Sequence, residues 1–401
     1  MKRLILIVAV IAIAAVSLPA DVFRFAYTKG EKYRILSQVH ESVYINGRFS
    51  HDVDILNKIA VAVTDTKGDA GYHVVDFQTS ERLYGSQNTY EWTEHSTSEF
   101  WKDGRGAYTI DPSYYLPVVR DIPLFPEGDV PQGGAWSATG MESHDFRTNF
   151  GIQEPFQFPV TVNYRYESNI TRNGVACALF SIEYEISYPV TPPRATTRMS
   201  PTKVTGYSHQ RYWWNLAEKK PVSIEESFDF LFVMNTGDDV EFKGDASGDV
   251  ITSLPLDRAQ VAGDIQKQLD AQAIPDVSVQ PTDQGVTITL ENVNFPPNSD
   301  QLLPAEQGKL RRIAEILRKY SDRDISIAGF TARAPGYTEN DYQTLSEQRA
   351  NAAADFLLST GAVDAKRLTA RGMGASSPIG DNSSEAGMRK NRRVEITILE
   401  N

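Results

Sequence analysis

Apolar and polar residues alternate one by one over long parts of the first 245 residues. Between Val160 and Tyr166 every second residue is valine or tyrosine, and between Ala176 and Ile186 every second residue is again apolar. Because neighbouring side chains of a strand point to opposite faces, this pattern predicts half-buried β-strands. We therefore expect an antiparallel, mainly β domain over residues 21–245. Turn signals punctuate it at Asn46-Gly47, Lys67-Gly68-Asp69, Lys102-Asp103-Gly104 and Asn173-Gly174.

A proline- and glycine-rich stretch from Leu116 to Trp136 interrupts this rhythm. We expect an ordered surface loop that leads into a strand, with a binding loop as the alternative. Many strands of the domain are expected to be short. Cys177 lies on one predicted strand, and we expect it to be buried as a small hydrophobic residue.

Small and acidic residues follow the β domain. Residues 246–275 are expected to form a solvated linker with a helical segment near Leu256–Gln272. The histidines show no metal-binding spacing, and the acidic residues lack the spacing of an EF-hand calcium loop, so we predict no metal site. The acidic residues considered are Asp238, Asp239, Glu241, Asp245 and Asp249.

From residue 276 the pattern changes to alternating strands and helices. Within Pro304–Tyr320, apolar residues such as Leu310, Ile313 and Leu317 recur at helical spacing. The resulting β-α-β-α-β order predicts an α/β sandwich with helices on one face, and an α+β class for the whole chain. The other expected elements are the strands Val286–Leu290 and Ile325–Gly329, the helix Thr344–Thr360, and the strands Lys366–Gly372 and Arg393–Leu399.

Residues 1–20 are expected to be a cleaved secretory signal peptide. Lys2 and Arg3 precede an uncharged apolar stretch from Leu4 to Val16. That stretch is shorter than the roughly 20 residues of a membrane-spanning helix, and small residues near Ala20 suit cleavage. An uncleaved anchor is the alternative.

Composition narrows the function classes. The chain has 401 residues and a net charge of −12, which disfavours nucleic-acid binding because a polyanion is repelled. Its single cysteine excludes an intrachain disulfide, a cysteine-based zinc site and an iron–sulfur cluster. Gly372-Met373-Gly374 lacks the third glycine of a dinucleotide loop, and the segment around Ser208 lacks the second glycine of a nucleophile elbow. We predict no cofactor and no enzymatic activity.

Residues 276–401 also carry an ordered set of short motifs. They are Val293-Asn294-Phe295 with Asn298-Ser299 and Leu302, Gly329-Phe330-Thr331, Leu345-Ser346-Glu347-Gln348-Arg349-Ala350, Gly361, Arg367-Leu368, Gly372, Gly374, Pro378, Asp381-Asn382 and Asn391-Arg392-Arg393-Val394-Glu395. The set resembles the OmpA-like, peptidoglycan-associating C-terminal domain family. This resemblance implies the family fold and non-covalent attachment to the peptide stem of the cell wall. The overall style of the chain is similar to that of spirochaete envelope proteins, and the first 275 residues match no family that we can name.

The resemblance implies a site for a zwitterionic diaminopimelate residue. In the family, an aspartate takes the ammonium group, and the arginine of the Leu-Ser-x-x-Arg-Ala helix takes the carboxylate through a bidentate fork. That arginine is Arg349 here. Thr331, Asn391, Arg392 and Arg393 occupy other positions of the family site.

Three residues depart from the family site. Phe330 stands where the family has histidine, Ala332 where it has the aspartate, and Tyr342 where it has asparagine. The acid that would hold the ammonium group is therefore missing from its usual place. Glu339 and Asp341, in a lengthened loop, are the candidate replacements. The alternative is that Arg349 is a solvated helix residue in a domain that retains only the fold.

These patterns predict an exported cell-envelope protein in the periplasm, associated with the outer membrane. Residues 276–401 hold peptidoglycan, and the β domain has a separate binding role. Two alternatives stay open: residues 21–245 form an integral outer-membrane β-barrel, or the protein is a ligand-binding protein or adhesin whose C-terminal domain no longer binds peptidoglycan. Other envelope proteins are further candidate partners.

Overall fold

The computed structural model describes residues 20–83, 90–147, 151–191, 199–252, 256–291 and 302–400. Residues 1–19 of the expected signal peptide and the motif residues 293–299 lie outside these ranges. Among the helices that are described, none combines the length and the apolar character needed to cross a membrane.

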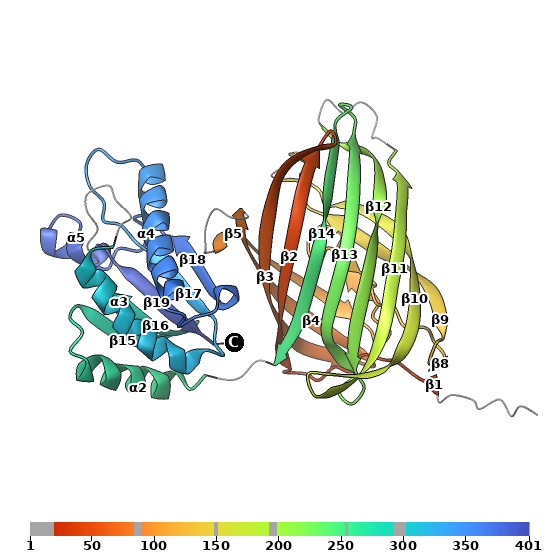
Figure 1. The fold of residues 1–401 in the computed structure, drawn as a ribbon, viewed down its shortest axis with the longest axis horizontal. Helices are drawn as coiled ribbons and strands as arrows, with labels where there is room; N and C mark the ends of the chain where they lie inside the picture. The colour runs from red at the N-terminus through yellow and green to blue at the C-terminus, as the bar shows by residue number, and fades with distance from the viewer. Residues whose placement is uncertain are drawn as a thin grey trace, which may run out of the picture.

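The N-terminal half is an antiparallel sheet that curls into a barrel (Figure 1). Where the sheet ends meet, the Ser98 hydroxyl donates to the Leu116 carbonyl over 2.6 Å, and the Tyr108 amide donates to Asp121 Oδ1 over 2.6 Å. The short strands are β1 (Ala20–Asp21), β6 (Tyr108–Ile110), β7 (Val119–Arg120) and β8 (Val130–Pro131). The long strands, in pairing order, are β9 (Ala135–His144), β10 (Phe156–Arg172), β11 (Val175–Pro189), β12 (Pro201–Asn215), β13 (Lys220–Met234), β14 (Asp239–Thr252), β2 (Lys32–Ile45), β3 (Arg48–Lys67), β4 (Ala70–Leu83) and β5 (Tyr90–Lys102).

The expectation of many short strands was wrong. The long strands run from 10 residues in β9 to 20 residues in β3. Register shifts occur in several ladders, for example between Val63 and Asp65 and between Tyr166 and Ser168. Because each extra residue reverses which positions face inward, a long strand looks like two short ones in the alternation pattern. The turns at Asn46-Gly47 and Asn173-Gly174 have the positive φ angles that such hairpins need.

The proline-rich stretch contributes to the interior as well as to the surface. Phe125 is fully buried, and its ring lies 5.7 Å from that of Phe23 and 4.9 Å from that of Trp214. The stretch therefore fills part of the barrel with an aromatic core. Cys177 is free and fully buried between Leu179 and Trp213, as expected.

The expected linker at 246–275 is largely built into the two domains. Strand β14 continues through residues 246–252, where it pairs with β2. Helix α2 (Arg258–Ala271) places Ile265 and Leu269 in the core of the C-terminal domain. On β14 the outward-facing residues are charged and several inward-facing residues are small. This composition resembles that of a linker, which explains the different expectation.

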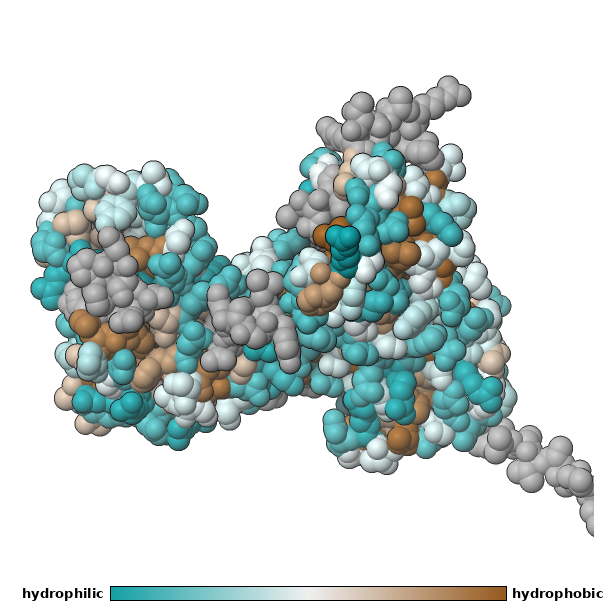
Figure 2. All heavy atoms as spheres, turned by 45° about the horizontal axis from the view of Figure 1, so that its top comes forward, coloured by the Kyte–Doolittle hydropathy of each residue, from teal (hydrophilic) through white to brown (hydrophobic). Residues whose placement is uncertain are grey.

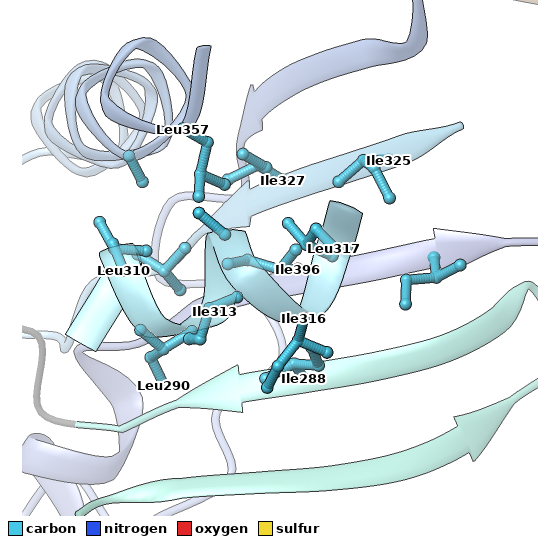
Figure 3. Packing of buried hydrophobic residues seen from close by; sticks show 14 of the residues in the cluster. Ile288, Leu290, Leu310, Ile313, Ile316, Leu317, Ile325, Ile327, Leu357 and Ile396 are labelled. Carbon is cyan, nitrogen blue, oxygen red and sulfur yellow. The ribbon is translucent and has the colours of Figure 1, made fainter. Parts of the chain in front are cut away.

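The C-terminal domain is a mixed sheet with helices on one face (Figure 1). Ile288, Ile327 and Ile396 from the sheet pack against Leu310 of α3 and Leu357 of α4 (Figure 3). The strand order is β15-β16-β19-β17-β18, and β17 and β18 run parallel. The elements are β15 (Val277–Thr282), β16 (Gly285–Leu290), α3 (Pro304–Leu317), a 3₁₀ turn (Arg318–Tyr320), β17 (Ile325–Gly329), α4 (Glu339–Ser359), a second 3₁₀ turn (Ala365–Arg367), β18 (Leu368–Gly372), α5 (Glu385–Asn391) and β19 (Val394–Leu399).

The two domains share a hydrogen-bonded edge and a buried charge cluster. Tyr90 and Glu91 of β5 pair in parallel with Thr369 and Ala370 of β18. Asp324, at the start of β17, forms ion pairs with Arg34 of β2 and, at 3.4 Å, with Lys58 of β3. Asp324 and Lys58 are 2% and 4% exposed, so this contact excludes water. It joins the outer wall of the barrel to the C-terminal sheet.

Candidate functional site

Arg349 lies on α4 with 9% of its surface exposed. Burial and the neighbouring Arg392 charge lower the pKa of Arg349 to about 10, while Tyr337 acts in the opposite direction. A pKa of about 10 leaves the guanidinium charged at neutral pH. Two arginines close together in a partly buried place create a positive field, so this site favours an anion.

The end of β17 brings the Gly-Phe-Thr motif under α4. A Cβ atom on Gly329 would lie 2.3 Å from the Ser346 carbonyl oxygen, so only glycine permits this close packing. Backbone hydrogen bonds hold the next two residues in place. The Phe330 N–H donates to the Arg393 carbonyl and the Thr331 N–H donates to the Gly374 carbonyl, both over 2.9 Å. The Thr331 hydroxyl is buried and has no hydrogen-bond partner in the described part of the chain.

Phe330 replaces the family's histidine with a different interaction. The Arg393 guanidinium lies over the Phe330 ring, 3.6 Å from its centroid. The same side chain donates to Glu395 over 2.7 Å and to the Ser377 carbonyl over 3.2 Å. Arg393 is 3% exposed and is held by these partners, while its Nη1 atom has no hydrogen-bond partner among the described residues.

Asn391 and Arg392 have different roles at the same edge. The buried Asn391 amide accepts hydrogen bonds from the backbone of Ile379 and Gly380 and donates to the Asn382 side chain over 2.9 Å. It therefore holds the loop before α5 in place. Arg392 pairs with Glu385 over 2.6 Å and adds its charge to the surroundings of Arg349.

Both candidate replacement acids make contacts within the chain. Glu339 forms a two-point ion pair with Arg333, at 2.5 and 3.1 Å. Asp341 accepts from the Thr338 amide and hydroxyl, each over 2.7 Å, in a capping box that starts α4. These hydrogen bonds hold the pKa of Asp341 below its usual range.

The capping box also explains why α4 begins at Glu339 rather than at the expected Thr344. Thr338 followed by Asp341 is a sequence signal for a helix start. Tyr342 is then buried on the first turn, and its hydroxyl bonds to both backbone groups of Ala334, at 2.9 and 2.6 Å. Tyr342 stands at the position of the family's asparagine, and its hydroxyl holds the lengthened loop in place.

Sequence reasoning missed two residues of this site. Arg333 directly follows Ala332 and adds a further cation near the place of the family's acid. Tyr337 is 45% exposed, and its ring stacks on Tyr342 with 6.0 Å between centroids. The sequence signal that could have indicated this pair is the spacing of Tyr337 and Tyr342 on either side of the start of α4. The site as a whole offers cations and aromatic surface, with its nearby acids already in hydrogen bonds.

Part of the chain is similar to known proteins. Residues 294–392 match the OmpA family. The probable lipoprotein YiaD of Escherichia coli is 35% identical over 138 residues, which are 34% of this chain and 62% of that protein. The peptidoglycan-binding protein ArfA of Mycobacterium bovis is 34% identical over 106 residues, which are 26% of this chain and 32% of that protein.

One solved structure is the cell wall anchor of the T6SS from Pseudomonas aeruginosa, with 30% identity and a TM-score of 0.31. It covers 36% of this chain and 100% of its own. This chain thus spans 62% of the first curated relative and about a third of the next two. Residues 294–392 form an OmpA family domain.

Proposed function

We propose that this protein is a non-enzymatic component of the cell envelope whose C-terminal domain associates with peptidoglycan. The observation that carries the proposal is the buried, charged Arg349 beside Arg392, at the position of the family's carboxylate-binding arginine. A guanidinium offers a planar fork that matches a carboxylate, and the low exposure of Arg349 strengthens that pairing. The ligand is a carboxylate of the peptide stem.

The missing acid changes what the site recognises. Ala332 replaces the family's aspartate and the nearby Glu339 is paired with Arg333, so the ammonium group of a diaminopimelate residue loses that partner. The site then depends on the stem carboxylate and on aromatic contact with Tyr337. We expect weaker binding than in a site with both halves, and less selectivity for the amine.

The outer surface of the barrel favours a place in water rather than in lipid. On β10, Pro159, Thr161, Asn163 and Arg165 are exposed while the residues between them are buried. Figure 2 shows one face of the molecule, where hydrophilic residues cover most of the barrel and hydrophobic ones form smaller areas. A membrane barrel has the opposite arrangement, with an apolar outer band. This observation supports a periplasmic location over the integral outer-membrane alternative.

A sacculus co-sedimentation assay tests the proposal. The full chain should sediment with purified peptidoglycan, and Arg349→Ala should weaken binding at least tenfold because a buried charged partner is lost. Arg349→Lys should recover part of the binding, and Arg311→Ala, an exposed arginine on α3, is the matched control. Ala332→Asp should strengthen binding to diaminopimelate-containing walls. Equal sedimentation of the native protein and Arg349→Ala would remove the basis of the proposal.

A further inference from the structure

The barrel contains a partly open cavity of about 590 Å³ between β2–β5 and β12–β14. Its wall is mainly apolar and includes Ile35, Ile59, Val75, Phe77 and Phe100. A Cβ atom built on the lining residue Gly248 would meet a single neighbour within 4 Å, the Ile35 Cγ2 atom at 3.7 Å. The space is therefore unfilled by this chain's own side chains. Its volume lies within the range of small-molecule sites, about 300–1,000 Å³.

One deeply buried polar group of the wall lacks a partner within the described ranges. His73 is 2% exposed, and its Nδ1 lies 2.9 Å from the Gly71 carbonyl, which can only accept, so Nδ1 carries the hydrogen. Its other nitrogen, Nε2, has no hydrogen-bond partner. Tyr212 is also 2% exposed and lines the cavity. Buried polar groups are normally paired, so the unpaired acceptor Nε2 of His73 points to a ligand.

A cation and further hydroxyl groups lie at the same part of the wall. The Lys102 ammonium is 4.2 Å from the centroid of the Phe25 ring and 4.8 Å from that of Tyr108. No carboxylate of the described chain lies within ion-pair distance of it. Burial is the main cause that raises the pKa of Tyr212 above that of a free phenol, and the nearby Tyr108 and Tyr33 raise it further. The tyrosine hydroxyls and the Lys102 charge therefore gather near the end of β5.

Other charged residues line the same wall, and Lys220 among them pairs with Glu31. Glu226, in the middle of β13, accepts a hydrogen bond from Ser208 over 2.6 Å, and burial raises its pKa to about 7. An anionic group is attracted to Lys102, which has no such partner among the described carboxylates. A ligand with one anionic end therefore has one favoured orientation, with its head at Lys102 and its apolar part along the isoleucine and phenylalanine wall.

We propose that the barrel cavity binds a single-chain amphiphile with a small anionic head, of the fatty-acid class. Lys102 and the tyrosine hydroxyls hold the head, and the aliphatic and aromatic wall covers the chain. The proposal is independent of peptidoglycan binding, because it concerns a different domain and different residues.

Calorimetric titration of the full chain with hexadecanoate and with 1-hexadecanol tests this proposal. Hexadecanoate should bind, and the alcohol should bind at least tenfold more weakly. Lys102→Gln should reduce hexadecanoate binding to the level of the alcohol. Gly248→Phe should abolish binding of both, because the ring fills the cavity. Lys203→Gln, an exposed lysine on β12, should change nothing.

Circular dichroism of each variant checks that it is folded. Should Gly248→Phe or Lys102→Gln fail to fold, Tyr212→Phe removes only one oxygen and should weaken hexadecanoate binding severalfold. Absence of hexadecanoate binding by the native protein would overturn the proposal. Unchanged binding by a folded Gly248→Phe would overturn it as well.

Discussion

The C-terminal domain and the barrel bury apolar residues in different ways. The C-terminal interior is aliphatic and tightly filled, and Ile288, Ile327 and Ile396 are each fully buried (Figure 3). The barrel interior is rich in aromatic rings and leaves about 590 Å³ open. A filled core holds the guanidinium of Arg349 in a defined place, whereas an open core leaves room for a ligand. One chain thus combines a rigid attachment domain with a hollow domain, and Asp324 links the two.

Removing the link should have the largest effect. Asp324→Ala leaves Lys58 and Arg34 in the interface without their carboxylate, and breaking a buried ion pair costs about 3–5 kcal/mol. Thermal unfolding should shift to lower temperature, and proteolysis near residues 252–258 should become faster. Asp322→Ala, an exposed neighbour, should have an effect below about 0.5 kcal/mol. Equal effects of the two substitutions would show that the buried cluster does not join the domains.

A pair of isoleucine substitutions compares the filled and hollow interiors directly. Ile327→Ala should cost about 2–5 kcal/mol, since it opens a hole in a packed core. Ile59→Ala should cost about 1 kcal/mol or less, because its side chain already borders open space.

Each domain has its own optical signal for this comparison. All 5 tryptophans lie within the first 214 residues, so their fluorescence follows the barrel during urea unfolding. The helices α2 to α5 lie in the C-terminal domain, so the helical circular dichroism follows that domain. A larger loss for Ile59→Ala than for Ile327→Ala would mean that the barrel is the more tightly packed part.

The barrel should also lose stability as pH rises. Burial raises the pKa of Glu226 to about 7, well above its usual range, so the folded state favours the protonated form. The stabilisation is fully present below the unfolded-state pKa, near 4.5, and is lost as pH rises toward 7. Glu226→Gln should remove roughly 3 kcal/mol of this pH dependence between pH 4.5 and 7, measured by tryptophan-detected urea titrations. An unchanged slope would indicate that Glu226 is solvated.

A smaller effect is expected at the start of α4. Asp341→Ala removes the reciprocal bond of the capping box and should cost about 1 kcal/mol, read from the helical signal. Peptidoglycan binding should stay within twofold, because Asp341 is occupied with Thr338. A tenfold loss of binding with little loss of stability would instead make Asp341 the replacement acid.

Local patterns in the sequence predicted most of the C-terminal domain. Helix periodicity located α3, and the ordered motifs located Arg349 within α4. The start of α4 was missed because the Thr338–Asp341 box was not recognised. In the barrel, alternation predicted the strands and the buried Cys177, but bulges concealed their lengths.

Other features depend on contacts between distant residues. Asp324 lies 290 positions from Arg34, and no local pattern brings them together. The cavity could not be predicted either, because alternation shows which side chains face inward but not whether they fill the space. His73 and Lys102 could not be predicted as ligand-binding candidates either, because that role depends on the cavity they line.

The carboxylate dependence of peptidoglycan binding tests the central claim most directly. The full chain is titrated calorimetrically with a soluble muropeptide that carries a free diaminopimelate carboxylate, and with the same muropeptide amidated at that carboxylate. If Arg349 holds the carboxylate, the free acid should bind at least tenfold more tightly, and Arg349→Ala should bind both forms equally weakly. Equal affinity of the native protein for both forms, or no binding of either, would contradict the account.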